Sequence, residues 1–143
     1  MIILACDHAG YQLKEDIKAF FNKENITTID VGTYSRESTD YPDFAKAANK
    51  KVVENPNNIG IYICGSGIGM SMAANRNPKI RAALCTTVYF AELARRHNDA
   101  NVLVLSGRYT SKLKAISIIK AFLTTKFEGG RHLRRIKKLN SKD

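Results

Sequence analysis

The chain has 143 residues, of which 44% are hydrophobic and 25% are charged, the composition of one folded domain rather than of a disordered chain. No apolar run approaches the length needed to cross a bilayer, and the opening MIILACDHAG has no basic segment ahead of its apolar run, so we expect a cytoplasmic protein without a signal peptide. The net charge of +10 is uneven, because residues 131–143 alone contribute +5.

Apolar, β-branched runs recur along the chain, and near-continuous runs of this kind are typical of buried parallel strands. They span residues 2–6, 26–31, 59–64, 80–85 and 102–105. Segments with helical periodicity separate them. The alternation of strand and helix predicts one α/β domain over residues 1–143, with a five-stranded parallel sheet and right-handed crossovers.

The predicted helices each carry an apolar stripe that we expect to be core. The third continues the glycine-rich segment through residues 71–75, and the fourth spans residues 88–96. The stripes of the first, second and fifth helices consist of Leu13, Ile17, Phe20 and Phe21, then Phe44, Ala48 and Val52, then Leu113, Ile116, Lys120 and Leu123.

Two glycines, Gly129 and Gly130, precede a last, very basic helix predicted for residues 131–139. Leu133, Ile136 and Leu139 recur every three residues, so this helix also buries a narrow stripe. We therefore expect the C-terminal helix and tail, residues 131–143, to pack on a neighbouring subunit.

Polar residues gather where the predicted strands end. Asp7 and His8 follow the first strand, residues 64–69 the third, and residues 106–108 the fifth. In open α/β sheets, ligands bind at the carboxyl ends of the strands. The sequence therefore predicts a binding site at this edge.

The segment after the third strand, residues 64–69, reads CGSGIG. Dinucleotide-binding proteins have G-x-G-x-x-G in the first turn and an acidic residue about 20 positions on, whereas residues 83–86 here read ALCT. No Walker A sequence occurs either. Two interpretations stay open: a tight turn after a buried strand, or backbone N–H groups that bind an anion or stabilise an oxyanion and a Cys64 thiolate.

The remaining candidates have structural alternatives. Cys6 and Cys85 end apolar runs and are expected to be reduced core residues, since no CxxC or zinc-like spacing occurs. His97 is either a surface or capping group or an acid–base group. Arg131 and Arg135 lie one turn apart, which fits either a solvated helix face or a phosphate clamp.

Six motifs follow one another along the chain: CDHAG at residues 6–10, TDYP at 39–42, CGSGIG at 64–69, AANR at 73–76, RHND with NV at 96–102, and EGGRH at 128–132. Together they resemble type B ribose-5-phosphate isomerase, whose family also contains the galactose-6-phosphate isomerase subunits. The match runs from residue 2 to about residue 135 without a large gap. Several independent motifs make this resemblance specific.

The resemblance implies a Rossmann-like three-layer α/β/α sandwich with an extra C-terminal helix. It also implies interconversion of ribose 5-phosphate and ribulose 5-phosphate, a step of the non-oxidative pentose phosphate pathway. The expected assembly is a homodimer or a dimer of dimers with active sites at the subunit interface, and no metal or organic cofactor is implied.

By the same resemblance, Cys64 is the base that moves a proton between C2 and C1, and Ser66 offers its hydroxyl to the enediolate. Some members carry a glutamate further along the loop, but residues 69–72 here read GMSM. His97 matches the acid–base group that opens the sugar ring. The implied sugar ligands are Asp7, Tyr41 and Asn98; the implied phosphate ligands are His8, Arg108, Arg131 and Arg135; and the implied oxyanion donors are the N–H groups of Gly65, Gly67 and Gly69.

The nearest alternative is the same reaction on another phosphosugar, allose 6-phosphate or galactose 6-phosphate. The basic C-terminal helix could instead bind nucleic acid, but no DNA- or RNA-binding motif and no interleaved aromatic residues accompany the charge. A Cys–His hydrolase is less well supported, because Cys64 is not the centre of a nucleophile elbow. We expect a phosphosugar and a second copy of the chain as partners, and neither nucleic acid nor membrane.

Overall fold

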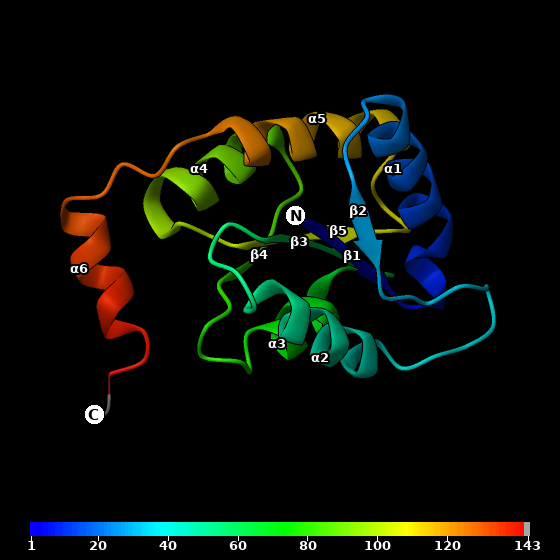
Figure 1. Cartoon of the computed structure of the whole chain (residues 1–143), viewed down its shortest axis with the longest axis horizontal. Coiled ribbons are helices and arrows are strands. Elements are labelled where there is room, and N and C mark those ends of the chain that lie inside the picture. Colours follow the sequence, from blue (N-terminus) through cyan, green and yellow to red (C-terminus); the bar gives the residue numbers. More distant parts are fainter. Residues whose placement is uncertain (142–143) are drawn as a thin grey trace.

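A central sheet of five parallel strands organises the chain in the computed structural model, which describes residues 1–141 (Figure 1). The strands lie in the order β2-β1-β3-β5-β4, and every neighbouring pair is parallel. Their bounds are β1 Ile2–Cys6, β2 Thr28–Asp30, β3 Ile59–Cys64, β4 Ala82–Leu84 and β5 Val102–Ser106. The predicted five-stranded parallel sheet is confirmed.

The two edge strands are shorter than the apolar runs that predicted them. The N–H of Ile26 donates to Phe21 O at the end of the first helix, and the N–H of Ile80 donates to Asn77 O in a turn. The backbone N–H groups of both residues therefore bond within local turns and not to a neighbouring strand. Hydrophobicity marks burial, and it does not separate a strand from the turn that leads into it.

Helices cover both faces of the sheet (Figure 1). One face carries α1, α4 and α5, and the other carries α2 and α3, so the predicted three-layer sandwich is confirmed. The bounds are α1 Tyr11–Lys23, α2 Tyr41–Val52, α3 Ile68–Ala74, α4 Val88–Asn98 and α5 Lys112–Thr124, with a 3₁₀ turn, η1, at His8–Gly10. No helix in residues 1–141 combines the length and the apolar character that a bilayer span requires.

Alternate residues of the strands feed two separate cores. In β1, Leu4 faces α1 and α5, whereas Ile3 and Ala5 face α2 and α3. This alternation is the two-residue repeat of a strand covered on both sides. Such a sheet is rigid, and it fixes the positions of the loops at its ends.

The buried face of α5 differs from the predicted one. Leu113 is 79% exposed, and Ile116 and Leu123 are only half-buried. The buried stripe consists of Ala115, Ile118, Ile119 and Phe122. Because this helix is apolar on most of its circumference, periodicity alone could not select the face, and tertiary packing did.

The last helix, α6 (Arg131–Lys138), follows Gly129 and Gly130, both of which have positive φ. It stands apart from the sandwich beside α4 (Figure 1). Leu133 is 42% and Leu139 is 64% exposed, so the apolar stripe is not buried within one chain. The predicted helix is confirmed, its packing on a neighbouring subunit stays a prediction, and residues 142 and 143 of the predicted tail lie outside the described residues.

Candidate active site

The strand order reverses between β1 and β3, and the loops that leave their carboxyl ends meet at this point. Crevices at such switch points are where open α/β sheets bind ligands. The β1 loop provides Asp7 and His8, the β3 loop begins at Cys64, and the neighbouring β5 loop carries Arg108. The structure thus brings together the strand-end residues that the sequence predicted.

Cys64 is the last residue of β3 and is 4% exposed. Its Sγ accepts a hydrogen bond from the N–H of Gly67 at 3.2 Å. Gly67 adopts the left-handed conformation with φ +82, and a Cβ there would lie 2.5 Å from Leu84 Cδ1, so only glycine fits this turn. The turn thereby directs a backbone N–H donor at the sulfur.

The remainder of the glycine loop is held by the neighbouring loops. Ser66 Oγ accepts from the N–H of Ile68 at 3.2 Å, and α3 begins there, three residues earlier than the predicted helical segment. A Cβ on Gly65 would lie 3.1 Å from Arg108 Nη1, and one on Gly69 would lie 2.5 Å from Tyr41 Cζ. Arg108 and Tyr41 therefore border the glycine loop, and their role as substrate ligands stays a prediction.

Asp7 is buried at 6% exposure and caps η1. Its Oδ1 accepts from the N–H groups of Ala9 at 3.0 Å and Gly10 at 3.2 Å. This use is structural, and it leaves Oδ2 to the predicted contact with a sugar hydroxyl. The capping fixes the direction in which His8 leaves the strand.

His8 is paired with Thr39 by two reciprocal hydrogen bonds of 3.1 Å each. The backbone N–H of His8 donates to Thr39 Oγ1, and the backbone N–H of Thr39 donates to His8 Nδ1. Because Nδ1 accepts, the ring proton of a neutral His8 lies on Nε2. Nε2–H is then the donor available to a phosphate oxygen.

The other predicted site residues lie at the opposite ends of the strands, where the strands begin. His97 and Asn98 end α4, and Asn101 O, three residues later, accepts from the N–H of Gly60 at the start of β3. Cys64 lies at the end of the same strand. The strand β5 has five residues, so its two ends lie roughly 13 Å apart at a strand rise of about 3.3 Å per residue. One chain therefore does not bring Cys64 and His97 together.

Arg131 and Arg135 lie on α6, on the His97 side of the molecule (Figure 1). Both are exposed. A hollow of about 270 Å³ is lined by His97, Asn98, His132, Arg135, Ile136 and Leu139. The predicted residues therefore fall into two half-sites: the Cys64 half-site, which also holds Asp7, His8, Ser66 and Arg108, and the His97 half-site, which also holds Asn98, Arg131 and Arg135.

Three residues of the His97 side could be considered as metal ligands. Donor atoms of His97, Glu128 and His132 all lie within 4.8 Å of one another. However, the two imidazole rings are stacked, with centroids 4.4 Å apart and planes at 11°. Lone pairs lie in the ring planes, so two parallel rings cannot direct theirs at one ion about 2.1 Å away. In this arrangement the group does not form a metal site.

Comparison with known proteins decides the family. The family model described as Ribose/Galactose Isomerase matches residues 2–139. The chain belongs to the ribose/galactose isomerase family. A putative sugar phosphate isomerase of Rickettsia bellii is 48% identical over 138 residues, which is 96% of each chain.

Solved structures agree with this family membership. A ribose 5-phosphate isomerase of Thermotoga maritima is 50% identical with a TM-score of 0.94, and the match covers 96% of this chain and 94% of that one. Ribose-5-phosphate isomerase B of Mycoplasma genitalium, solved with bound ribulose 5-phosphate, is 43% identical with a TM-score of 0.92, over 96% and 92% of the two chains. The predicted family and fold are confirmed.

The structure gives specific contacts to residues for which the sequence analysis assigned no role. Ser106 ends β5 opposite Cys64, and its Oγ donates to Gly65 O at 2.7 Å. Thr39, in the quoted TDYP motif, holds His8. Lys14 is fully buried, and its spacing from Ile17 and Phe21 on the apolar face of α1 was the available signal.

Proposed function

We propose that the chain interconverts ribose 5-phosphate and ribulose 5-phosphate. The observation that carries the proposal is the Cys64 half-site: a sulfur at the switch point of the sheet accepts a backbone N–H, with His8 and Arg108 on the flanking loops. Family membership and the bound ribulose 5-phosphate in the Mycoplasma genitalium relative support the same assignment.

The isomerisation requires a base beside the C2 carbon of the open-chain aldose. The Cys64 thiolate takes the proton from C2, electrons move onto the carbonyl oxygen at C1, and an enediolate forms. The C2 hydroxyl then passes its proton to the C1 oxygen, the same sulfur returns the first proton to C1, and the carbonyl forms at C2. The hydroxyl of Ser66 and the N–H groups of the glycine loop stabilise the enediolate oxygens, an effect worth roughly 3 kcal/mol for one well-placed donor.

Ribose 5-phosphate is mostly a closed furanose, so the ring must open first. His97 is the proposed acid–base group: a proton leaves the anomeric hydroxyl, the bond between C1 and the ring oxygen breaks, and the ring oxygen is protonated. Asp7, Tyr41 and Asn98 are the proposed partners of the sugar hydroxyls and the ring oxygen. Steps of this kind gain about 10²–10⁴-fold from a positioned acid or base.

A second copy of the chain completes each site in this proposal. His8 and Arg108 meet one side of the phosphate, and Arg131 and Arg135 of the other copy meet the opposite side. Guanidinium groups suit this task because they bind phosphate oxygens in a fork. The exposed Leu133 and Leu139 on α6 supply apolar surface for the contact.

A coupled assay for ribulose 5-phosphate tests the function. The wild-type protein should be active, Cys64→Ala should lose roughly 10²-fold or more of the activity, and His97→Ala should lose activity mainly on ring-form substrate. Cys85→Ala, which removes a buried thiol outside the site, is the matched control and should stay active. Full activity in Cys64→Ala would refute the proposed base.

The preferred sugar, the homodimer and the cytoplasmic location stay predictions. Allose 6-phosphate and galactose 6-phosphate are the alternative substrates, and the same assay with six-carbon phosphosugars decides between them. Light scattering measures the assembly, which should be a dimer or a larger even-numbered oligomer.

A further inference from the structure

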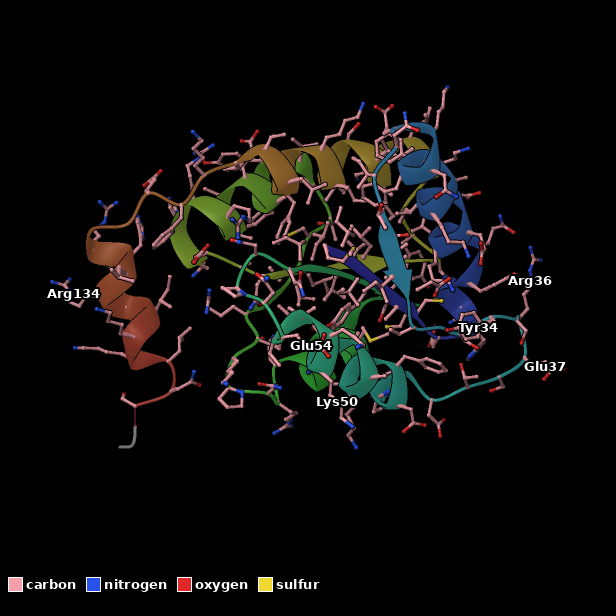
Figure 2. All side chains as sticks on the ribbon, in the orientation of Figure 1. Tyr34, Arg36, Glu37, Lys50, Glu54 and Arg134 are labelled. Atoms are coloured by element: carbon pink, nitrogen blue, oxygen red, sulfur yellow. The ribbon has the colours of Figure 1, made fainter. Side chains whose placement is uncertain are left out.

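His132 is the one residue of α6 that is buried among the described residues, at 6% exposure. Gly129 and Gly130 precede the helix, and a Cβ added at either position would meet no atom within 4 Å. The neighbouring side chain of Arg134 points away from the sandwich (Figure 2). His132 is therefore the principal side-chain anchor of α6 on the body of the protein.

The partner of this anchor is the His97 ring. The two imidazoles are stacked, with their centroids 4.4 Å apart and their planes at 11°. In residues 1–141, no side-chain hydrogen bond involves the His97 ring, so packing against His132 is what sets its orientation. Planar rings in such contact favour a narrow range of relative orientations.

Glu128 lies beside His132. Its Oε2 lies 3.4 Å from His132 Nε2, and its backbone N–H donates to Arg96 O at 3.1 Å, one residue before His97. Among the described residues, the buried Nε2 atom of His132 makes no hydrogen bond. A small rotation of the Glu128 carboxylate toward Nε2 would supply an acceptor, as buried polar groups usually have. The backbone bond thus ties the carboxylate to the same helix end that carries His97.

The electrostatic surroundings of His132 favour its neutral form. Burial lowers the pKa of the His132 imidazole, the nearby Arg131, His97 and Arg135 lower it further, and the Glu128 carboxylate opposes them. A neutral ring can stack on His97 in both of its protonation states, whereas two protonated rings 4.4 Å apart would repel each other. The stack is therefore compatible with an acid–base cycle on His97.

We propose that His132 is a positioning residue that, by stacking on the His97 ring, orients that ring for opening of the sugar ring. This proposal rests on the proposed isomerase function and on the assignment of ring opening to His97. Since Arg131 and Arg135 lie on the same helix, His132 also links the phosphate ligands of α6 to the acid–base group. The His97 half-site then acts as one unit.

Two variants of similar volume separate orientation from space filling. His132→Phe keeps a planar ring that can stack, whereas His132→Leu fills the space without stacking. On ribose 5-phosphate, His132→Leu should lose about tenfold in kcat, and His132→Phe should stay within about threefold of wild type. KM should change little in either variant. Arg134→Ala, on the outer face of α6, is the matched control and should match wild type.

Erythrose 4-phosphate supplies the second readout. Its C4 hydroxyl carries the phosphate, so it cannot close a furanose ring and needs no ring opening. On this substrate, all three variants should match wild type within about twofold, because proton transfer at Cys64 is untouched. The imidazole NMR signals of His97 should shift in His132→Leu and remain near their wild-type positions in His132→Phe.

Equal losses in His132→Phe and His132→Leu, or equal losses on the two substrates, would overturn the positioning role. Wild-type activity of His132→Leu on ribose 5-phosphate would overturn it as well. Failure of the isomerase proposal is distinguishable, because the wild-type protein itself would then convert neither substrate. If His132→Leu does not fold, the His132→Phe variant decides, since loss of its ring-form activity contradicts orientation by stacking.

Discussion

Lys14 is a fully buried cation, and its replacement by methionine should lower the free energy of unfolding by about 3 kcal/mol. Its Nζ lies 2.7 Å from both carboxylate oxygens of Asp30 and donates to Thr33 O at 2.6 Å, so all three ammonium protons are used. Methionine has a similar length and removes only the charge and the three hydrogen bonds. The loss stays near the lower limit for a broken buried pair, because Lys18 also contacts Asp30 at 3.0 Å.

Lys18→Met is the matched control, since Lys18 binds the same carboxylate but its side chain is 31% exposed. It should cost less than about 1 kcal/mol. Denaturant unfolding measures both variants, and for a chain of this length the Lys14→Met loss corresponds to a fall in Tm of roughly 10 °C. A Lys14→Met variant no less stable than Lys18→Met would refute the reasoning.

The pH dependence of this pair provides a second check. Burial alone would raise the pKa of the Asp30 carboxyl, but hydrogen bonds from Lys14, the Gly32 N–H and Lys18 hold it below its usual range. A depressed carboxyl pKa stabilises the fold above the unfolded value near 4, and the stabilisation is lost as pH falls through the folded value. The difference between wild type and Lys14→Met should therefore shrink below about pH 4.

Two further predictions concern the glycine loop and the core thiols. Gly67→Ala should cost roughly 2–3 kcal/mol in denaturant unfolding, because it combines positive φ with a clash at Leu84, whereas Gly129→Ala, with positive φ but open space, should cost about 1 kcal/mol; equal costs would contradict the clash. Burial raises the pKa of Cys6 to about 12 and of Cys85 to about 11, so the folded state keeps both thiols protonated. The unfolded chain ionises them near pH 9, and stability should fall by about 1.4 kcal/mol per thiol between pH 8 and pH 10, a loss that is absent for the thiol removed in Cys6→Ala.

The sheet could be predicted from the sequence because its strands are buried on both faces, and runs such as residues 59–64 leave little alternative. The face of α5 could not be predicted, because both Leu113 and Ile118 belong to apolar stripes and only packing selects one. The Lys14 pair was missed for a related reason. Its partners, Asp30 and Thr33, are 16 or more residues away, and nothing local indicates that a lysine will meet them.

The Cys64 half-site was also predictable, since strand ends meet at one edge of a parallel sheet whatever the loops do. The separation of Cys64 from His97 follows from the same rule, because α4 leads back to the amino ends of the strands before β5 begins. What the sequence pattern did not provide is the pairing of side chains across loops. The hydrogen bonds between Thr39 and His8 and the stacking of His132 on His97 both depend on the three-dimensional path of a loop.

The central proposal is that Cys64 of one copy and His97 of the other copy form each active site. The direct test is complementation between Cys64→Ala and His97→Ala chains that carry different tags and are expressed together. A dimer purified through both tags contains one site with both substitutions and one with neither, so it should show about half of the wild-type activity on ribose 5-phosphate. Activity of the mixed dimer no higher than that of the more active single variant would place both residues in a site within one chain, and it would contradict the proposal.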